Sequence, residues 1–236
     1  MTYTTKLNQY IAEDRLIRRA WTDLDDQGRE TACLLAAMSS EVAAKEDASA
    51  CPADIMPQWL AYLTPWMDDE GSDDVWPSMV RRYAAVAARW HVLNDETWRR
   101  LDYTARRIAL EDCLPLAGEA APAVDAVLIL LRREESGDAV ADSEWADARA
   151  DARAAEAAAW ADARAAEAAA WAAAGAAARA AAWAAEAAAG AAARAAARAA
   201  EAAARAAARA AADRITAAIL TAIEQSCDKA EKEKSK

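Results

Sequence analysis

The stretch from residue 139 to residue 223 consists almost entirely of alanine, and its other residues return at steps of three or four. Residues at these spacings lie on one side of an α-helix, so the larger side chains form one stripe on a methyl-covered helix. Alanine has the highest intrinsic helix propensity, and this segment can therefore be helical without much tertiary support. The stripe members that we assign to protein interaction are Trp145, Arg149, Arg153, Glu156, Trp160, Arg164, Glu167, Trp171, Arg179, Trp183, Arg194, Arg198, Arg205 and Arg209.

The stripe follows a repeat of 15 residues. The unit GAAARAAAWAAEAAA at 175–189 recurs at 190–204, with only Trp183 replaced by Arg198. Fifteen residues over four turns give about 3.75 residues per turn, above the ~3.6 of a straight helix, which favours a gentle right-handed supercoil over a heptad coiled coil. Gly175 and Gly190 are the candidate breaks, so the segment is either one long helix or a helical hairpin.

Composition divides the chain of 236 residues into three parts. We expect a mixed helical domain over 1–137, an alanine-rich helical rod over 138–225, and a charged, disordered tail over 226–236. The first part is long enough to bury a core of its own. Its apolar residues recur at helical spacing, and alternation typical of strands is absent from the sequence. The predicted fold class is therefore all-α, with about six helices before the rod.

The N-terminal part begins with three predicted helices, over 4–26, 29–44 and 58–63. Asp54 is the expected cap of the third helix, and Pro65 is expected to end or bend it.

Three further helices are expected before the rod. The first follows Asp73 or Asp74 and runs to residue 93, and the second begins after Asn94 as its cap and ends near Pro115. The third runs from residue 121 to Ser136, where Gly137 supplies a stop signal.

The net charge of −11 lies mostly in the first 138 residues. An acidic domain repels phosphates, which disfavours non-specific binding to DNA or RNA. The rod carries only a small excess of arginine over glutamate between residues 175 and 212, too little for a phosphate-binding groove. An acidic domain can also imitate nucleic acid, although solubility explains the charge more simply.

Arginine pairs on two of the predicted helices form a candidate basic patch. Such a patch on an acidic domain suits an acidic partner, whereas pairing of each arginine with nearby acids on a solvated helix is the alternative. The six residues are Arg81, Arg82, Arg99, Arg100, Arg106 and Arg107.

Residues with catalytic or metal-binding chemistry are few. The five carboxylates of 68–74 lack the spacing and the closing glutamate of an EF-hand, so we expect a solvated loop. His91, the only histidine, falls at a predicted helix end, where an imidazolium is stabilised structurally. The four cysteines are far apart and lack metal-ligand spacing, which is typical of free thiols. We therefore predict no catalytic residue, no cofactor, no metal and no enzymatic activity.

No basic apolar leader opens the chain, and no run reaches the ~18 apolar residues of a membrane span. We expect a cytoplasmic protein that does not enter a membrane.

The run AAAWAAAGAAARAAAWAAEAAAGAAARAAARAA resembles the variable alanine-rich repeats of phage, prophage and bacterial proteins labelled as immunity proteins. The segments CPADIMPQWL and WPSMVRRYAAVAARWHVL also resemble an uncharacterised domain of phage and prophage proteins. The resemblance implies a non-enzymatic protein that binds and neutralises another protein inside a bacterial host. It assigns no functional residue.

The leading hypothesis is a helical protein-binding factor, an immunity or anti-defence inhibitor that occupies the surface of its partner. The first alternative is a self-assembling structural rod with a globular head, which forms a homo-oligomer through its alanine faces. The second alternative is a nucleic-acid-associated regulator.

Overall fold

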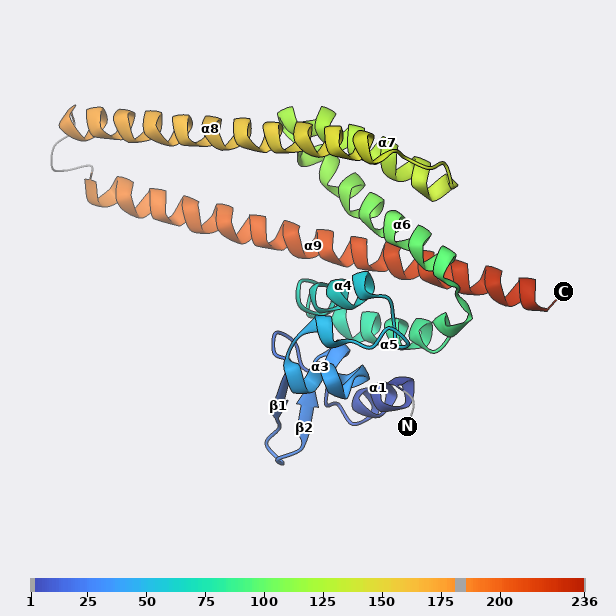
Figure 1. Cartoon of the computed structure of the whole chain (residues 1–236). Coiled ribbons are helices and arrows are strands. Elements are labelled where there is room, and N and C mark those ends of the chain that lie inside the picture. The colour runs from blue at the N-terminus through green and yellow to red at the C-terminus, as the bar shows by residue number, and fades with distance from the viewer. Residues whose placement is uncertain (1–2, 181–185, 236) are drawn as a thin grey trace. The chain divides into compact units, whose positions relative to one another are not determined.

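The structure is a computed structural model that describes residues 3–180 and 186–235 (Figure 1). The expected all-α class is confirmed, because helices dominate and one two-stranded sheet is the exception among the described residues. The chain forms two compact units. Unit 1 comprises Met1–Ala109 and Ala208–Lys236, and unit 2 comprises Leu110–Ala207.

Unit 1 contains short helices, a hairpin and two segments of longer helices. In chain order its elements are α1 (Tyr3–Ala12), β1 (Thr22–Leu24), β2 (Glu30–Ala32), α2 (Leu34–Met38), α3 (Ser40–Lys45), η1 (Ala48–Ala50), α4 (Gln58–Asp69), α5 (Trp76–Ala87), η2 (Trp90–Val92), most of α6 (Asp95–Cys113) and the end of α9 (Glu186–Lys234).

The predicted helix over 4–26 is wrong beyond Ala12, because the chain turns there and forms the antiparallel β1–β2 hairpin, with Thr22 opposite Ala32. Tertiary contacts override the helical pattern at this point. The Arg18 guanidinium donates hydrogen bonds to the carbonyl oxygens of Asp68, Asp69 and Gly71 at 2.7, 2.8 and 2.6 Å. These bonds hold the bend at residues 18–20 against the end of α4.

The predicted helix over 29–44 is also interrupted. Its first residues form β2, and Ser39 separates α2 from α3 in an extended conformation. The Ser39 hydroxyl accepts from the Val42 N–H at 3.3 Å and caps α3. Side-chain capping at an internal serine therefore replaces one long helix with two short ones.

Helix α4 is longer than the sequence predicts. It begins after Pro57 rather than under a cap from Asp54, and it continues through Pro65 to Asp69. A proline inside a helix costs about 3 kcal/mol. Beyond the proline, burial of Met67, which is 1% exposed, and the two hydrogen bonds that the Asp68 carboxylate accepts offset that cost.

Other boundaries agree more closely with expectation. Helix α5 begins at Trp76, slightly later than predicted, with Val75 before it. The side-chain oxygen Oδ1 of Asn94 accepts a hydrogen bond from the Thr97 N–H at 2.8 Å, which confirms the predicted cap of α6. Gly137 ends α7 with φ +90°, as its stop signal predicts.

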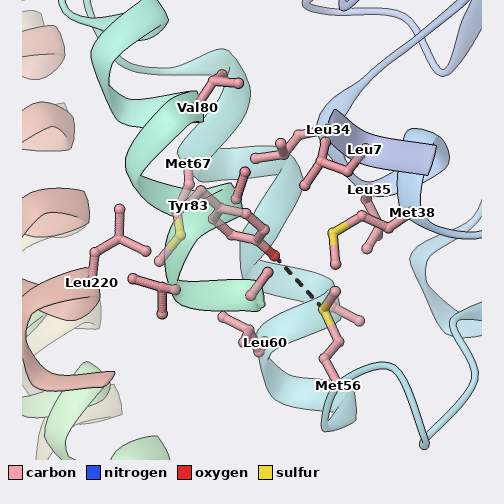
Figure 2. Close-up of a cluster of buried hydrophobic side chains, with 14 of the residues drawn as sticks. Leu7, Leu34, Leu35, Met38, Met56, Leu60, Met67, Val80, Tyr83 and Leu220 are labelled. Atoms are coloured by element: carbon pink, nitrogen blue, oxygen red, sulfur yellow. Dashed lines mark hydrogen bonds between the residues drawn. The ribbon is translucent and has the colours of Figure 1, made fainter. Parts of the chain in front are cut away.

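The core of unit 1 surrounds Tyr83 of α5. Figure 2 shows Leu60 and Met67 of α4, Leu34 of α2 and Leu220 of α9 around its ring. The Tyr83 hydroxyl lies 2.8 Å from the Thr64 hydroxyl, so its polar end is satisfied inside the core.

The end of α9 completes this core. Its buried residues recur at helical spacing: Ile215, Ile219, Leu220, Ile223 and Cys227. The sequence expects a disordered tail from residue 226, whereas α9 continues to Lys234. The predicted domain boundary at residue 137 therefore differs from the structure, in which unit 1 ends its first segment at Ala109 and also includes residues 208–236.

Ion pairs fix the polar side of this helix end. The Arg82 guanidinium donates to both carboxylate oxygens of Glu224, at 2.9 and 2.6 Å. The Arg89 guanidinium donates to both carboxylate oxygens of Glu231, at 3.1 and 3.0 Å, and to one oxygen of Asp228. These partners raise the pKa of Arg89 and lower the pKa of both carboxyls through hydrogen bonds to the guanidinium. The charged residues of the expected tail therefore anchor it.

The Asp213 carboxylate of α9 approaches the backbone closely at Gly71. The Ser72 N–H donates to the Asp213 carboxylate at 2.9 Å, and the Ser72 hydroxyl also bonds to it. A Cβ at Gly71 would lie 2.6 Å from Asp213 Oδ1. A side chain at position 71 would therefore displace the Asp213 carboxylate from its place beside Ser72.

Unit 2 contains the last residues of α6, then η3 (Leu114–Leu116), η4 (Gly118–Ala120), α7 (Ala121–Ser136), α8 (Asp142–Ala180) and the first part of α9. Helices α7 and α8 pack together, and Arg133 forms an ion pair with Glu144 between them. Leu128 and Leu131 of α7 and Ala148 of α8 are buried.

The alanine-rich segment is helical on both sides of the undescribed residues 181–185. Gly175 lies inside α8 and Gly190 inside α9, so neither glycine breaks its helix. High alanine propensity outweighs the ~1 kcal/mol cost of one glycine. Within the described ranges, no helix combines the length and the hydropathy that a bilayer span requires.

Candidate protein-binding surface

Two adjoining cavities open on unit 1. The first, the aromatic cavity, has a volume of about 630 Å³ and lies where residues 53–57, η2 and α6 meet. The second, the apolar groove, has a volume of about 650 Å³ and lies between α4, α6 and the end of α9. Trp59 and Asp102 line both cavities, so the two form one continuous surface.

The apolar groove arises because α4 has two apolar faces. Leu60, Ala61 and Met67 face the core of unit 1. A second set, spaced i, i+3, i+4 and i+7, lines the groove: Trp59, Tyr62, Leu63 and Trp66. A helix that is apolar on more than one side requires cover on each side. Tyr62 is nevertheless 57% exposed.

The other walls of the groove follow the same helical spacing. From α6, the groove receives Asp102, Ala105, Arg106 and Ala109, and from α9 it receives Ile215 and Ile219. Polar groups in the groove come from Gln58 and from the Asp102–Arg106 pair, in which Arg106 donates at 2.8 and 3.0 Å. The floor is therefore apolar and the charges lie on one wall.

The sequence contains a local signal for the α4 wall of this groove. Ending the helix near residue 63 hides the recurrence that continues to Trp66. Once α4 extends through Pro65, the second apolar face becomes visible in QWLAYLTPWM. The contribution of Ile215 and Ile219 has no local signal, since they lie about 150 residues further along the chain.

Packed indole rings hold the aromatic cavity in shape. The ring centroids of Trp59 and Trp98 lie 6.2 Å apart at 65°, and those of Trp90 and Trp98 lie 6.0 Å apart at 68°. Edge-to-face pairs of this kind stabilise a cluster beyond the area they bury. The Trp90 Nε1–H also donates to the Tyr3 hydroxyl at 3.0 Å. The cavity is thus lined by side chains whose positions the core determines.

Trp59 carries an unsatisfied polar group at the junction of the two cavities. Its Nε1–H is buried and has no hydrogen-bond acceptor among the described residues. Burying such a donor without an acceptor costs about 1–3 kcal/mol.

Acidic side chains surround the aromatic cavity. Asp54, Asp95 and Asp102 line it, together with His91 and Arg99. Arg99 donates to the Glu96 carboxylate at 2.7 Å, which offsets its charge locally. The surface is therefore electrostatically suited to a cation.

The arginines of the candidate basic patch do not form an unpaired cluster. Arg82 bonds to Glu224, Arg99 and Arg100 bond to Glu96, and Arg106 bonds to Asp102. Arg81 is exposed, and Arg107 is half-buried with an interaction of its own. For Arg82, Arg99, Arg100 and Arg106, the structure therefore agrees with the alternative interpretation, in which each arginine pairs with a nearby acid.

The interaction stripe is exposed wherever its side chains are described, apart from Trp145, which is half-buried. Trp160 is 61% exposed. Arg149, Arg153, Glu156, Arg164, Glu167, Arg198, Arg205 and Arg209 are exposed as well. Trp183 and the side chains of Trp171, Arg179 and Arg194 lie outside the described part of the chain. The role of the stripe stays a prediction.

The acidic loop is not solvated throughout. Asp68 is buried and accepts from the Leu34 N–H at 2.9 Å and from the Trp76 Nε1–H at 2.6 Å, while Asp73 pairs with Arg18. In the described part of the chain, no three His, Cys, Asp or Glu side chains are placed to hold a metal ion. The carboxylates of Asp68 and Asp73 therefore join structural elements, whereas Glu70 and Asp74 are exposed.

The remaining reactive side chains also have structural surroundings. His91 is exposed, with Nδ1 3.1 Å from the Ala88 carbonyl oxygen. All four cysteines are free thiols, and burial raises the pKa of Cys33, Cys51 and Cys227 to about 11. A thiol with so high a pKa is a poor nucleophile.

The fold and the surface together define an all-α protein with an open apolar groove on one compact unit. Comparison with protein-family models, curated proteins and solved structures finds no match to this chain. The resemblance to phage and bacterial alanine-rich proteins thus stays a prediction.

Proposed function

We propose that this chain is a non-enzymatic protein-binding factor, and that the apolar groove of unit 1 is its binding site. The observation that carries this proposal is the second apolar face of α4, open at Tyr62 and completed by Ile215 and Ile219. Clusters of Trp and Tyr in a pocket are typical of the residues that dominate protein interfaces.

The partner is a protein segment with an apolar face and positive charge, most simply an amphipathic helix. Groove residues from α4 and α6 span about two helical turns each, which matches helix-in-groove recognition. The net charge of −11 and the acids beside the groove favour a basic partner. By covering this apolar, basic segment of its partner, the chain would act as an immunity or anti-defence inhibitor.

Replacing Tyr62 with Glu tests this function. We expect partner affinity to fall by about thirtyfold, because a central interface tyrosine contributes roughly 2 kcal/mol and a buried carboxylate is costly. The full-length tagged protein is used to isolate a stoichiometric partner, which is identified, purified and titrated calorimetrically against both forms. Leu24→Glu is the matched control, because Leu24 is 66% exposed on β1, away from the groove. Equal affinity of Tyr62→Glu and the parent protein would contradict the proposal.

Self-assembly through the alanine-rich helices is the second candidate function. Its support is the exposure of residues 196–210 on α9 and of the described stripe positions on α8 after Trp145. Alanine faces allow close helix contact, and Trp160 supplies an exposed apolar anchor. Light scattering across a wide concentration range should then give masses above that of a monomer, and Trp160→Ala should lower them. A monomer mass at every concentration rules this candidate out.

A further inference from the structure

We propose that the aromatic cavity binds a guanidinium group, namely the side chain of an arginine on the protein that occupies the apolar groove. This inference rests on the proposed function and specifies the chemistry of its partner. The two cavities share Trp59 and Asp102, so one bound segment can reach both. A volume of about 630 Å³ is in the usual range for ligand sites, about 300–1,000 Å³.

The lining of the cavity combines aromatic surface with carboxylates. Trp59 and Trp98 contribute indole rings that cross at 65°, so a bound group meets aromatic surface in more than one plane. Trp90, which is 2% exposed, packs on Trp98 at 68° and supports its position. Asp54 and Asp95 add carboxylates that form no ion pair among the described residues. Indole rings attract cations through their quadrupole, and carboxylates attract them through their charge.

The charges exclude an anionic ligand. Three carboxylates line the cavity, and the guanidinium of Arg99 is engaged by Glu96 through two bonds at 3.1 and 2.7 Å. An anion would therefore meet acids without a free cation to oppose them. Among cations, guanidinium is planar and weakly hydrated, stacks on aromatic rings and binds carboxylates with two parallel hydrogen bonds.

The chain itself contains two examples of this arrangement. The Arg15 guanidinium lies 4.2 Å from the Tyr10 ring centroid and bonds to Glu13 at 2.8 Å. Arg18 lies 5.9 Å from the Trp76 ring centroid and pairs with Asp73. In each case an aromatic ring and a carboxylate hold one guanidinium. The aromatic cavity offers the same pair of groups without an internal arginine between them.

The test uses the full-length protein and N-acetyl-arginine-N-methylamide as the ligand. Indole N–H signals in ¹H–¹⁵N spectra report on Trp59 and Trp98 directly. We expect saturable shifts of both signals, with half-saturation in the millimolar range. The neutral citrulline counterpart should produce no saturable shift. The absence of a saturable shift with the arginine ligand, or equal binding of the lysine counterpart, overturns the assignment to guanidinium.

A double substitution separates the cavity from general charge. Asp54→Asn with Asp95→Asn should raise the half-saturation concentration about three- to tenfold, as two weakened ion pairs predict. Asp26→Asn with Asp74→Asn changes the net charge equally at exposed sites outside the cavity and should leave binding unchanged. Equal effects of the two double variants overturn the proposal. Two results together would separate the two proposals. If Tyr62→Glu loses partner binding but the parent protein does not bind the arginine ligand, the groove is the protein-binding site and the aromatic cavity is not a guanidinium site.

Discussion

Ile223→Asp is expected to destabilise unit 1 by about 4 kcal/mol. Ile223 is 0% exposed and packs into the core that surrounds Tyr83. The substitution removes a large apolar side chain and buries a carboxylate without a partner, and each change alone costs several kcal/mol. We expect loss of near-ultraviolet circular dichroism and earlier unfolding in urea. Far-ultraviolet dichroism should fall less, because the alanine-rich helices depend mainly on their own propensity.

Gln225→Asp is the matched control for this substitution. Gln225 lies two residues away on the same helix and is exposed. The same charge is introduced there, and stability should change by no more than about 0.5 kcal/mol. If Ile223→Asp and Gln225→Asp unfold alike, residues 208–234 do not complete the core of unit 1.

Asp68→Ala is expected to destabilise the protein by about 3 kcal/mol. The carboxylate accepts from the Leu34 N–H and the Trp76 Nε1–H, and it thereby joins the start of α2 and the start of α5 to the end of α4. Alanine leaves both donors without an acceptor, at about 1–3 kcal/mol for each buried group. Urea unfolding followed by tryptophan fluorescence measures the loss. Asp74→Ala, at an exposed position nearby, should be close to neutral.

The pH dependence of stability provides a second measurement on Asp68. Burial raises the pKa of this carboxyl to about 6, against about 4 in the unfolded chain. The folded state therefore binds the proton more tightly, and the stabilisation from this group is complete below pH 4 and lost as pH rises through 6. The stability of the parent protein relative to Asp68→Asn should fall by about 2 kcal/mol between pH 4.5 and 7. A constant difference across that range would contradict the shifted pKa.

Local sequence was sufficient for several parts of the fold. The alanine-rich segment is helical because its propensity is intrinsic, and α6 begins at Asn94 because the cap is a local hydrogen bond. Gly137 ends α7 for a similarly local reason, since glycine adopts positive φ without strain. Each of these features depends on residues within a few positions of one another.

Contacts between distant residues decided the features that the sequence predicted wrongly. Arg18 binds carbonyl groups some 50 residues away and helps to hold the chain that follows α1 against the end of α4. Helix α4 continues through Pro65 because Met67 and Asp68 are buried against other elements. The local spacing of apolar residues contains no information about either contact. The sequence therefore predicted a first helix that is too long and an α4 that is too short.

The candidate binding surface depends on tertiary structure even more strongly. The sequence by itself determined an all-α chain with long alanine-rich helices, because helix propensity acts within each turn. Only the tertiary structure decided that residues 208–234 pack on unit 1 and that Ile215 and Ile219 join α4 and α6 around the groove. The physical reason is that burial of apolar side chains and pairing of Arg82 and Arg89 with α9 join segments about 140 residues apart.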